Sequence, residues 1–378
     1  MPNPFEADLN YKEGLRCLES GEFEAAYALF DSLVKDWPFV PDVWACRALA
    51  LGHLQRYSES LDSFDRALEF NPDDERIWFN RGIVLRDWGK VEKALLSFER
   101  AIEIKEKSYE AWTEKGNCEI MLGRNKEALE SYYQAGTINP EDYKAWGNRG
   151  NAFVNLGNFQ RAVKSYKKAL KINQNDPELW FNYGCCLMAM DNKEEAMATF
   201  DKALEINPQH LSSLINKGIL FYKLERHQEE LDCYNRAVEI NPQETHAWNN
   251  RGLALRRMNR VKEAIASYDK AIECDPNNYE AWDNRGYALT KLGKYKDALA
   301  SVQKSLEIKP DHVNGIYNTG YCYAFMGKIK LAVDPISEAI KRNPEKYLPA
   351  AKTDPDLERL RKNKRFQAFL DGKWRMEN

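Results

Sequence analysis

Aromatic rings, small residues and prolines recur along this chain at a fixed interval of 34 residues. Stepping by 34 from Gly14 lands on glycine at nine of ten positions and on Ala48 at the other. With this glycine as position 8 of a 34-residue unit, position 4 is tryptophan in seven units and position 24 is aromatic in eight. Positions 20 and 27 are each alanine in eight units, and position 32 is proline in eight. One period held at so many positions predicts an array of repeated structural units.

The apolar and small positions predict two helices in each unit. Positions 4, 8 and 11 share one face of a first helix, and positions 20, 24 and 27 share one face of a second. Proline at position 32 cannot continue a helix, so it closes the unit. A single pair of 34 residues cannot bury its apolar face. We therefore expect stacked pairs, which form an all-α solenoid.

The register also predicts the boundaries of the units. We expect an N-terminal extension at 1–6, ten units within 7–346, and a C-terminal capping segment at 347–378. The predicted units are 7–40, 41–74, 75–108, 109–142, 143–176, 177–210, 211–244, 245–278, 279–312 and 313–346. Pro335 is expected to kink or shorten the second helix of the last unit.

The capping segment is expected to contain one further helix. Thr353 or Asp354 is a suitable N-cap for it, with Pro355 in the first turn. Its buried stripe is expected to comprise Leu357, Leu360, Phe366, Phe369 and Leu370.

The 34-residue pattern resembles that of the tetratricopeptide repeat (TPR) family over about nine-tenths of the chain. This resemblance implies a right-handed superhelix of antiparallel helix pairs, with first helices lining a concave groove and second helices outside. It also implies a non-enzymatic scaffold that binds an extended polypeptide segment in the groove. Two other functions remain open: an architectural protein whose units self-associate end to end, and a helical repeat array that binds RNA.

Charges at positions 7 and 25 vary together along the chain. Position 7 is basic in seven units, and the residue 16 earlier, at position 25 of the preceding unit, is often acidic. The opposite-charge pairs are Asp31–Arg47, Asp65–Arg81, Glu99–Lys115, Asp201–Lys217 and Asp269–Arg285. Where position 25 is Lys167 or Gln303, position 7 loses its positive charge. We expect a ladder of ion pairs between neighbouring units, each worth about 0.2–1 kcal/mol if exposed.

Asparagine recurs at position 6, although it is a mediocre residue for a helix interior. The seven residues are Asn80, Asn148, Asn182, Asn216, Asn250, Asn284 and Asn318. The resemblance implies that position 6 faces the groove, where amides of the free protein would be exposed. An amide both donates and accepts, which suits the backbone of an extended peptide. The alternative, that this asparagine is a common preference of the family without a binding role, remains open.

Other groove positions, 2, 5, 9, 12 and 13, collect amides in the middle of the chain and basic or aromatic residues later. The additional amides are Asn117, Asn151 and Asn155; the later residues are Tyr222, Lys223, Arg256, Arg257 and Lys291. A ligand with an acidic segment would suit the basic stretch. A solvated charged face is the alternative. The lysine, asparagine and arginine pattern with which some TPR domains clamp a C-terminal carboxylate is incomplete here.

Composition narrows the function further. The formal net charge of −3 over 378 residues gives no bias toward nucleic acid, so we expect none as a partner. No apolar run has the length of a membrane span, and the N-terminus does not resemble a signal peptide, so we expect a cytoplasmic protein without membrane insertion. The five histidines are scattered and no phosphate-binding loop occurs, so no catalytic residue, metal or cofactor is expected. The oligomeric state is left open.

Overall fold

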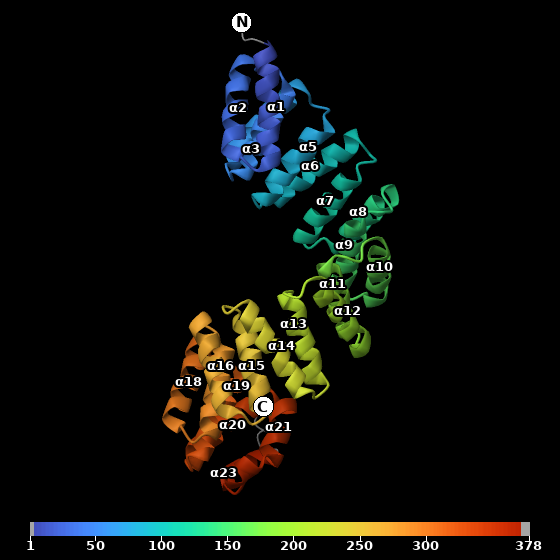
Figure 1. Ribbon diagram of the computed structural model, residues 1–378. Coiled ribbons are helices and arrows are strands. Elements are labelled where there is room, and N and C mark those ends of the chain that lie inside the picture. Colours follow the sequence, from blue (N-terminus) through green and yellow to red (C-terminus); the bar gives the residue numbers. More distant parts are fainter. Residues whose placement is uncertain (1–3, 372–378) are drawn as a thin grey trace. The chain divides into compact units, whose positions relative to one another are not determined.

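The computed structural model describes residues 4–371, and the regular secondary structure within them is entirely helical (Figure 1). The first helices are α1 (Pro4–Ser20), α3 (Pro41–His53), α5 (Glu75–Asp87), α7 (Tyr109–Met121), α9 (Tyr143–Asn155), α11 (Pro177–Ala189), α13 (Leu211–Lys223), α15 (Thr245–Arg257), α17 (Tyr279–Lys291) and α19 (Val313–Phe325). The second helices are α2 (Phe23–Asp36), α4 (Tyr57–Phe70), α6 (Val91–Ile104), α8 (Asn125–Ile138), α10 (Phe159–Ile172), α12 (Lys193–Ile206), α14 (His227–Ile240), α16 (Val261–Cys274), α18 (Tyr295–Ile308) and α20 (Ile329–Arg342). The helix pairs expected from the 34-residue pattern are therefore present.

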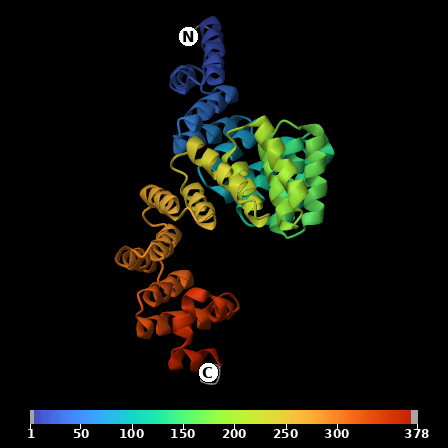
Figure 2. The same cartoon turned by 60° about the horizontal axis from the view of Figure 1, so that its bottom comes forward.

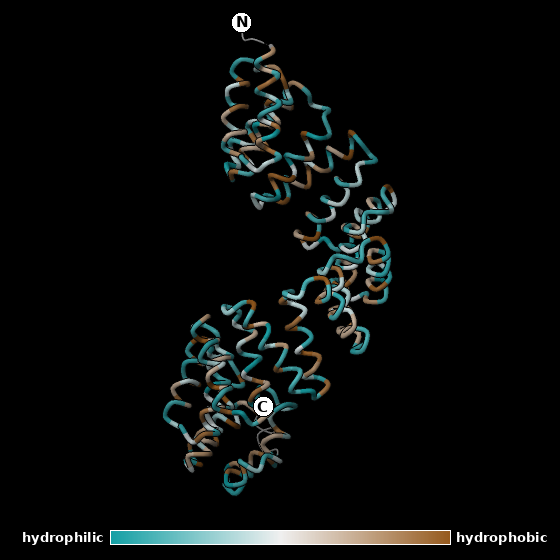
Figure 3. Tube along the Cα trace, in the orientation of Figure 1, coloured by the Kyte–Doolittle hydropathy of each residue, from teal (hydrophilic) through white to brown (hydrophobic). Residues whose placement is uncertain are grey.

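The chain divides into two compact parts, one ending at Thr199 and the other beginning at Phe200. From α1 to α11 in one part, and from α13 to α20 in the other, successive helices pack against each other, as α9 does with α8 and α10. Hydrophobic and hydrophilic residues alternate along the turns of each helix (Figure 3), so one stripe of each helix is buried against its neighbours. Figure 2 shows the same succession of helices from another side.

Position 8 is glycine because the ring at position 24 occupies the space of its side chain. A Cβ atom on Gly150 would lie 2.6 Å from Tyr166, and one on Gly82 would lie 2.7 Å from Phe98. Both rings are almost fully buried between the two helices of their unit. The glycine therefore allows the first and second helices to approach closely.

The tryptophans at position 4 have a role that the pattern did not reveal. Their indole N–H groups donate to the backbone carbonyl of position 32 in the preceding unit, six residues earlier, as Trp78 does to Pro72 at 2.8 Å. The same bond forms in the other six units that carry this tryptophan. Most of these rings are only partly buried. They fix the connection between units as well as filling the core.

The C-terminal segment differs from the single helix that we expected. It contains α21 (Pro344–Thr353), a 3-10 turn η1 (Pro355–Leu357) and the short helices α22 (Glu358–Arg361) and α23 (Lys364–Leu370). Asp354 caps η1, and Asn363 accepts from two backbone N–H groups to begin α23. Three of the five residues of the expected buried stripe, Leu357, Leu360 and Phe366, are fully buried, and Phe369 and Leu370 are partly buried. Residues 1–3 of the predicted extension and 372–378 of the capping segment lie outside the described residues.

Two further details differ from expectation. Helix α20 keeps the 14 residues of the other second helices, so Pro335 does not shorten it. Helix α1 begins at Pro4, before the predicted unit boundary at Ala7. Within residues 4–371, no helix combines the length and apolarity needed to cross a membrane.

Candidate protein-interaction surface

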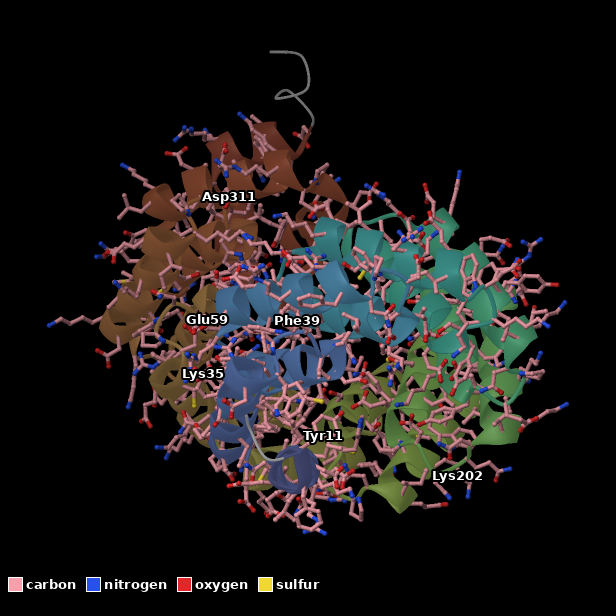
Figure 4. All side chains as sticks on the ribbon, turned by 90° about the horizontal axis from the view of Figure 1, so that it is seen from above. Tyr11, Lys35, Phe39, Glu59, Lys202 and Asp311 are labelled. Carbon is pink, nitrogen blue, oxygen red and sulfur yellow. The ribbon has the colours of Figure 1, made fainter. Side chains whose placement is uncertain are left out.

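The face formed by the first helices is the surface on which the candidate site residues gather; we call this face the groove. First helices of neighbouring units contact each other in both parts, as α5 does with α7 and α17 with α19. No pair of second helices within residues 4–371 packs as closely. A stack whose first helices lie closer together curves toward them. Side chains project from all sides of the helix pairs, including the labelled Lys202 of α12 (Figure 4).

The predicted ladder of ion pairs between units is confirmed at all five places. The distances are 2.8 Å for Asp31–Arg47, 3.0 Å for Asp65–Arg81, 3.3 Å for Glu99–Lys115, 2.5 Å for Asp201–Lys217 and 2.6 Å for Asp269–Arg285. The three arginines also donate to a serine of their own unit: Arg47 to Ser63 at 2.6 Å, Arg81 to Ser97 at 2.9 Å and Arg285 to Ser301 at 2.6 Å. The base at position 7 lies on a first helix and contacts the second helix of the preceding unit. The ladder is therefore structural and lies away from the groove.

Three of the position-6 amides are already engaged between neighbouring first helices. The bonds run from Asn148 to Asn117 at 3.0 Å, from Asn284 to Asn249 at 3.0 Å and from Asn318 to Asp283 at 2.8 Å. Asn216 donates instead to the Ser212 carbonyl of its own helix, at 2.9 Å. All four side chains remain partly exposed, but each uses one of its two N–H donors within the protein.

The amides of Asn80, Asn182 and Asn250 remain available. All three side chains are partly exposed, and they make no side-chain hydrogen bond to any residue between 4 and 371. They come from α5, α11 and α15. Each can offer two donors and one acceptor to a ligand without breaking a bond within the protein.

The amide-rich middle of the groove forms short bonded clusters. Asn117 accepts from Tyr132 at 2.8 Å as well as from Asn148, and Asn151 accepts from Tyr166 at 2.6 Å. Asn155 is exposed and donates to Asn125 at 3.1 Å. The oxygens of Asn117 and Asn151 thus satisfy tyrosine hydroxyls whose rings fill the core. This structural use was not evident from the sequence.

A basic pocket of about 750 Å³ lies at the ends of α15 and α17, beside the start of α16. Its lining residues include Arg256, Arg257, Lys262, Tyr287 and Lys291. The Arg256 guanidinium lies over the Tyr287 ring, 4.8 Å from its centroid. Arg256 makes no ion pair within residues 4–371, and Lys262 is exposed and likewise unpaired. The pocket thus presents two cations and an aromatic surface.

Arg257 is held in place by partners from the preceding unit. It pairs with the buried carboxylate of Glu230 at 2.6 Å, and its guanidinium lies 3.8 Å from the centroid of Tyr222. Tyr222 and Lys223 are both exposed. Arg257 therefore neutralises a buried acid, while its neighbour Arg256 is free to meet a ligand.

Lys291 is bound to a residue of the C-terminal segment. Its ammonium contacts the carboxylate of Asp356, which also accepts from the Tyr321 hydroxyl at 2.7 Å. These two bonds hold the pKa of Asp356 below its ordinary value, because both stabilise the charged carboxylate. Lys291 also lies 5.3 Å from the centroid of the Tyr321 ring, which stacks on Tyr287. Lys291, a predicted groove residue, thus already has an acidic partner within the chain.

Sequence reasoning missed Tyr287, Tyr321 and Asp356. The two tyrosines occupy position 9 of the last two units, a groove position, and that register could have identified them. No sequence signal identified Asp356. It lies 65 residues after Lys291 in the chain, and only the fold of the C-terminal segment brings the two side chains together.

Comparisons with known proteins agree with the helix pairs. A family described as tetratricopeptide repeat matches residues 11–75, 46–108 and 79–143, and a second of that description matches 267–300. A family described as the cilia and flagella-associated protein 70 middle TPR-like domain matches 130–273. An uncharacterized protein of Methanocaldococcus jannaschii is 34% identical over 80 residues, covering 19% of this chain and 93% of that protein.

Two solved structures illustrate the similarity. A TPR protein from Parabacteroides merdae has 19% identity and a TM-score of 0.50, covering 65% of this chain and 97% of its own. YrrB, described as a TPR protein with an unusual peptide-binding site, has 26% identity and a TM-score of 0.41, covering 49% and 95%.

Proposed function

The chain belongs to the tetratricopeptide repeat family, and on that premise we propose that it is a non-enzymatic scaffold that binds an extended protein segment in its groove. The bound segment would run across the first helices. Its backbone would meet the available amides of Asn80, Asn182 or Asn250. An acidic stretch would enter the basic pocket beside Arg256.

The observation that carries this proposal is the chemistry of the basic pocket. Arg256 and Lys262 bring two cations that no acid of residues 4–371 neutralises. Oppositely charged ligands gain affinity and association rate from such a surface. Tyr287 adds an aromatic wall on which apolar parts of a ligand can pack.

The contacts of Asp356 support the proposal that the ligand is acidic. The Asp356 carboxylate contacts Lys291 and the Tyr321 hydroxyl at the edge of the same pocket. One acid of this chain is thus already recognised by a lysine and a tyrosine of successive first helices. An aspartate or glutamate of a partner would meet two cations, Arg256 and Lys262, and the Tyr287 ring in this pocket.

The experiment compares two double variants of the full chain with equal loss of charge. Partners are captured on immobilised wild-type protein, identified, and titrated in purified form against each variant. R256Q/K262Q should weaken binding roughly tenfold, because two charge-assisted contacts are lost. K296Q/K330Q changes exposed lysines of α18 and α20, second helices, and should leave the affinity within about twofold, since screening limits distant charges. Equal effects of the two variants would refute a site at this pocket.

A further inference from the structure

The ladder between units is interrupted at Arg149. Arg149 occupies position 7, but the residue 16 earlier is Tyr133, where five other units have an acid. Its guanidinium lies over the rings of Tyr133, Trp146 and Phe153, at 5.1, 5.7 and 5.2 Å from their centroids. Its Nε is buried without a hydrogen-bond partner. Burial lowers the pKa of Arg149, as expected for a cation that has lost water and gained no carboxylate.

The same unit concentrates positive charge. Residues 143–176 contain seven Lys or Arg and one Asp, a net charge of +6 in a chain whose net charge is −3. Helix α10 alone carries five of these cations and no acid. A second helix with only basic charges is not needed for packing, because in the other units these helices mix both signs.

Most of these cations lack an acidic partner. Lys167 pairs with Glu195 of α12 at 3.3 Å. The remaining six make no ion pair within the part of the chain that the structure describes; they are Lys144, Arg149, Arg161, Lys164, Lys168 and Lys171. Clustered like charges repel one another. An anion that binds among them relieves this repulsion, which favours its binding.

A hollow of about 240 Å³ lies where these features meet. It is lined by Trp146, Arg149, Phe153, Arg161, Lys164 and Lys168. The Lys168 ammonium lies 3.4 Å from the centroid of the Trp146 ring, and both residues line the hollow. The volume suits the acidic group of a single side chain, with the aromatic rings excluding water around it.

We propose that this hollow binds a carboxylate or phosphoryl group on a side chain of a short acidic protein segment that crosses α10. The oxyanion supplies Arg149 with the hydrogen-bond acceptor that Asp or Glu of the preceding unit supplies to other bases of the ladder. Lys164 and Lys168 hold the same group from the rim. Because Arg149 points toward α8 and α10, this site is separate from the groove and independent of the function proposed for it.

Charge along the chain favours a short segment over a long polyanion. The units before and after this one, 109–142 and 177–210, each have three or two bases against seven or six acids, a net charge of −4. A nucleic acid strand that extends beyond α10 would meet this negative charge in either direction. A segment of a few residues meets only the basic helix.

The test uses fluorescein-labelled 12-residue peptides and the full chain at physiological ionic strength. One peptide alternates Glu and Ser, a second alternates phosphoserine and Gln, and a neutral peptide alternates Gln and Ser. A 12-nucleotide oligothymidylate completes the set. Fluorescence anisotropy measures each dissociation constant. We expect one or both acidic peptides to bind, the stronger of them identifying the preferred oxyanion, and the neutral peptide not to bind.

Matched variants locate the site. K164Q/K168Q should weaken the binding of the acidic peptide roughly tenfold, and R149Q should weaken it further. K144Q/K171Q removes the same charge from the same unit outside the hollow and should change binding by about twofold or less, because salt screens distant charges. Lys164 and Lys168 are exposed, so that variant reports on binding even if R149Q does not fold.

Three results would overturn the proposal. The first is that neither acidic peptide binds more tightly than the neutral peptide. The second is an equal loss of affinity in both double variants, which would show a diffuse charge effect. The third is that the oligothymidylate binds more tightly than either peptide with the same dependence on Lys164 and Lys168, which would assign the surface to nucleic acid.

Discussion

At the scale of single residues, the repeated glycine and tryptophan each have a specific contact with a neighbouring residue. Gly150 gives space to Tyr166, and Trp78 bonds to the carbonyl of Pro72. The ladder could be predicted because opposite charges vary together over 16 residues. The use of the amides could not, because whether Asn148 reaches Asn117 or remains free like Asn182 depends on distances between helices, and both have the same position in the repeat.

Replacing Gly150 with leucine should destabilise the protein by about 1–3 kcal/mol, because the new side chain enters the space of the Tyr166 ring. Hydrogen exchange should become faster in α9 and α10, since each unit of an array contacts only its neighbours. Lys144→Leu on the exposed side of α9 is the control and should change the unfolding free energy by about 0.5 kcal/mol or less. Unchanged protection in Gly150→Leu would show that this contact does not limit packing.

The ladder makes a second prediction at the residue scale. A double-mutant cycle with Asp269→Asn and Arg285→Met should give a coupling free energy of about 0.2–1 kcal/mol, since both groups are partly exposed. The cycle of Asp269→Asn with Lys304→Met, a lysine whose ion pair is with Glu307, should give a coupling near zero. Urea unfolding measures both. A coupling near zero for Asp269 with Arg285 would mean that the pair adds no stability.

At the scale of elements, the 34-residue period predicts where helices pair because a proline, a tryptophan or both mark each boundary between units. The capping segment lacks this repetition, so the number and order of its helices could not be predicted from the sequence. Its apolar residues do lie at roughly helical spacing, but Asp354 and Asn363 begin new turns at η1 and α23. Helical spacing identified which side chains are buried, whereas local capping decided how many helices carry them.

Asp356 joins this segment to the groove, and the bond should depend on pH. Because Lys291 and Tyr321 lower the folded-state pKa of Asp356, its contribution to stability is present above about pH 4, the ordinary aspartate value. This contribution is lost as the pH falls through the lower, folded-state value. Asp356→Asn should therefore be less stable than the wild type at pH 6, and the difference should shrink between pH 4 and lower pH. Urea unfolding at several pH values measures this difference.

The control for Asp356 is Asp311→Asn, which changes an exposed aspartate (Figure 4) that has no ion pair within residues 4–371. It should be close to the wild type in stability at each of these pH values. A stability difference for Asp356→Asn that does not vary with pH would contradict the ion pair with Lys291.

At the scale of the whole molecule, the proposed function uses the face of first helices that recurs in each part of the chain. Each of the two parts of the chain presents first helices with groove amides: Asn80 and Asn182 in one, Asn250 in the other. The repeat predicts this face, but not which of its residues are free, because the protein itself uses several of them. The proposal relies on the basic pocket for the acidic stretch of the ligand and on the three amides without an internal partner for its backbone.

The most direct measurement titrates a captured partner against the triple variant N80A/N182A/N250A. Alanine is the better helix former, so the variant should be as stable as the wild type or slightly more stable. Loss of about 0.5–1.5 kcal/mol for each hydrogen bond to the ligand should weaken binding tenfold or more. The control, Q160A/Q228A/Q303A, removes three exposed amides from second helices and should bind normally. Equal affinity of both triple variants and the wild type would contradict binding through the groove.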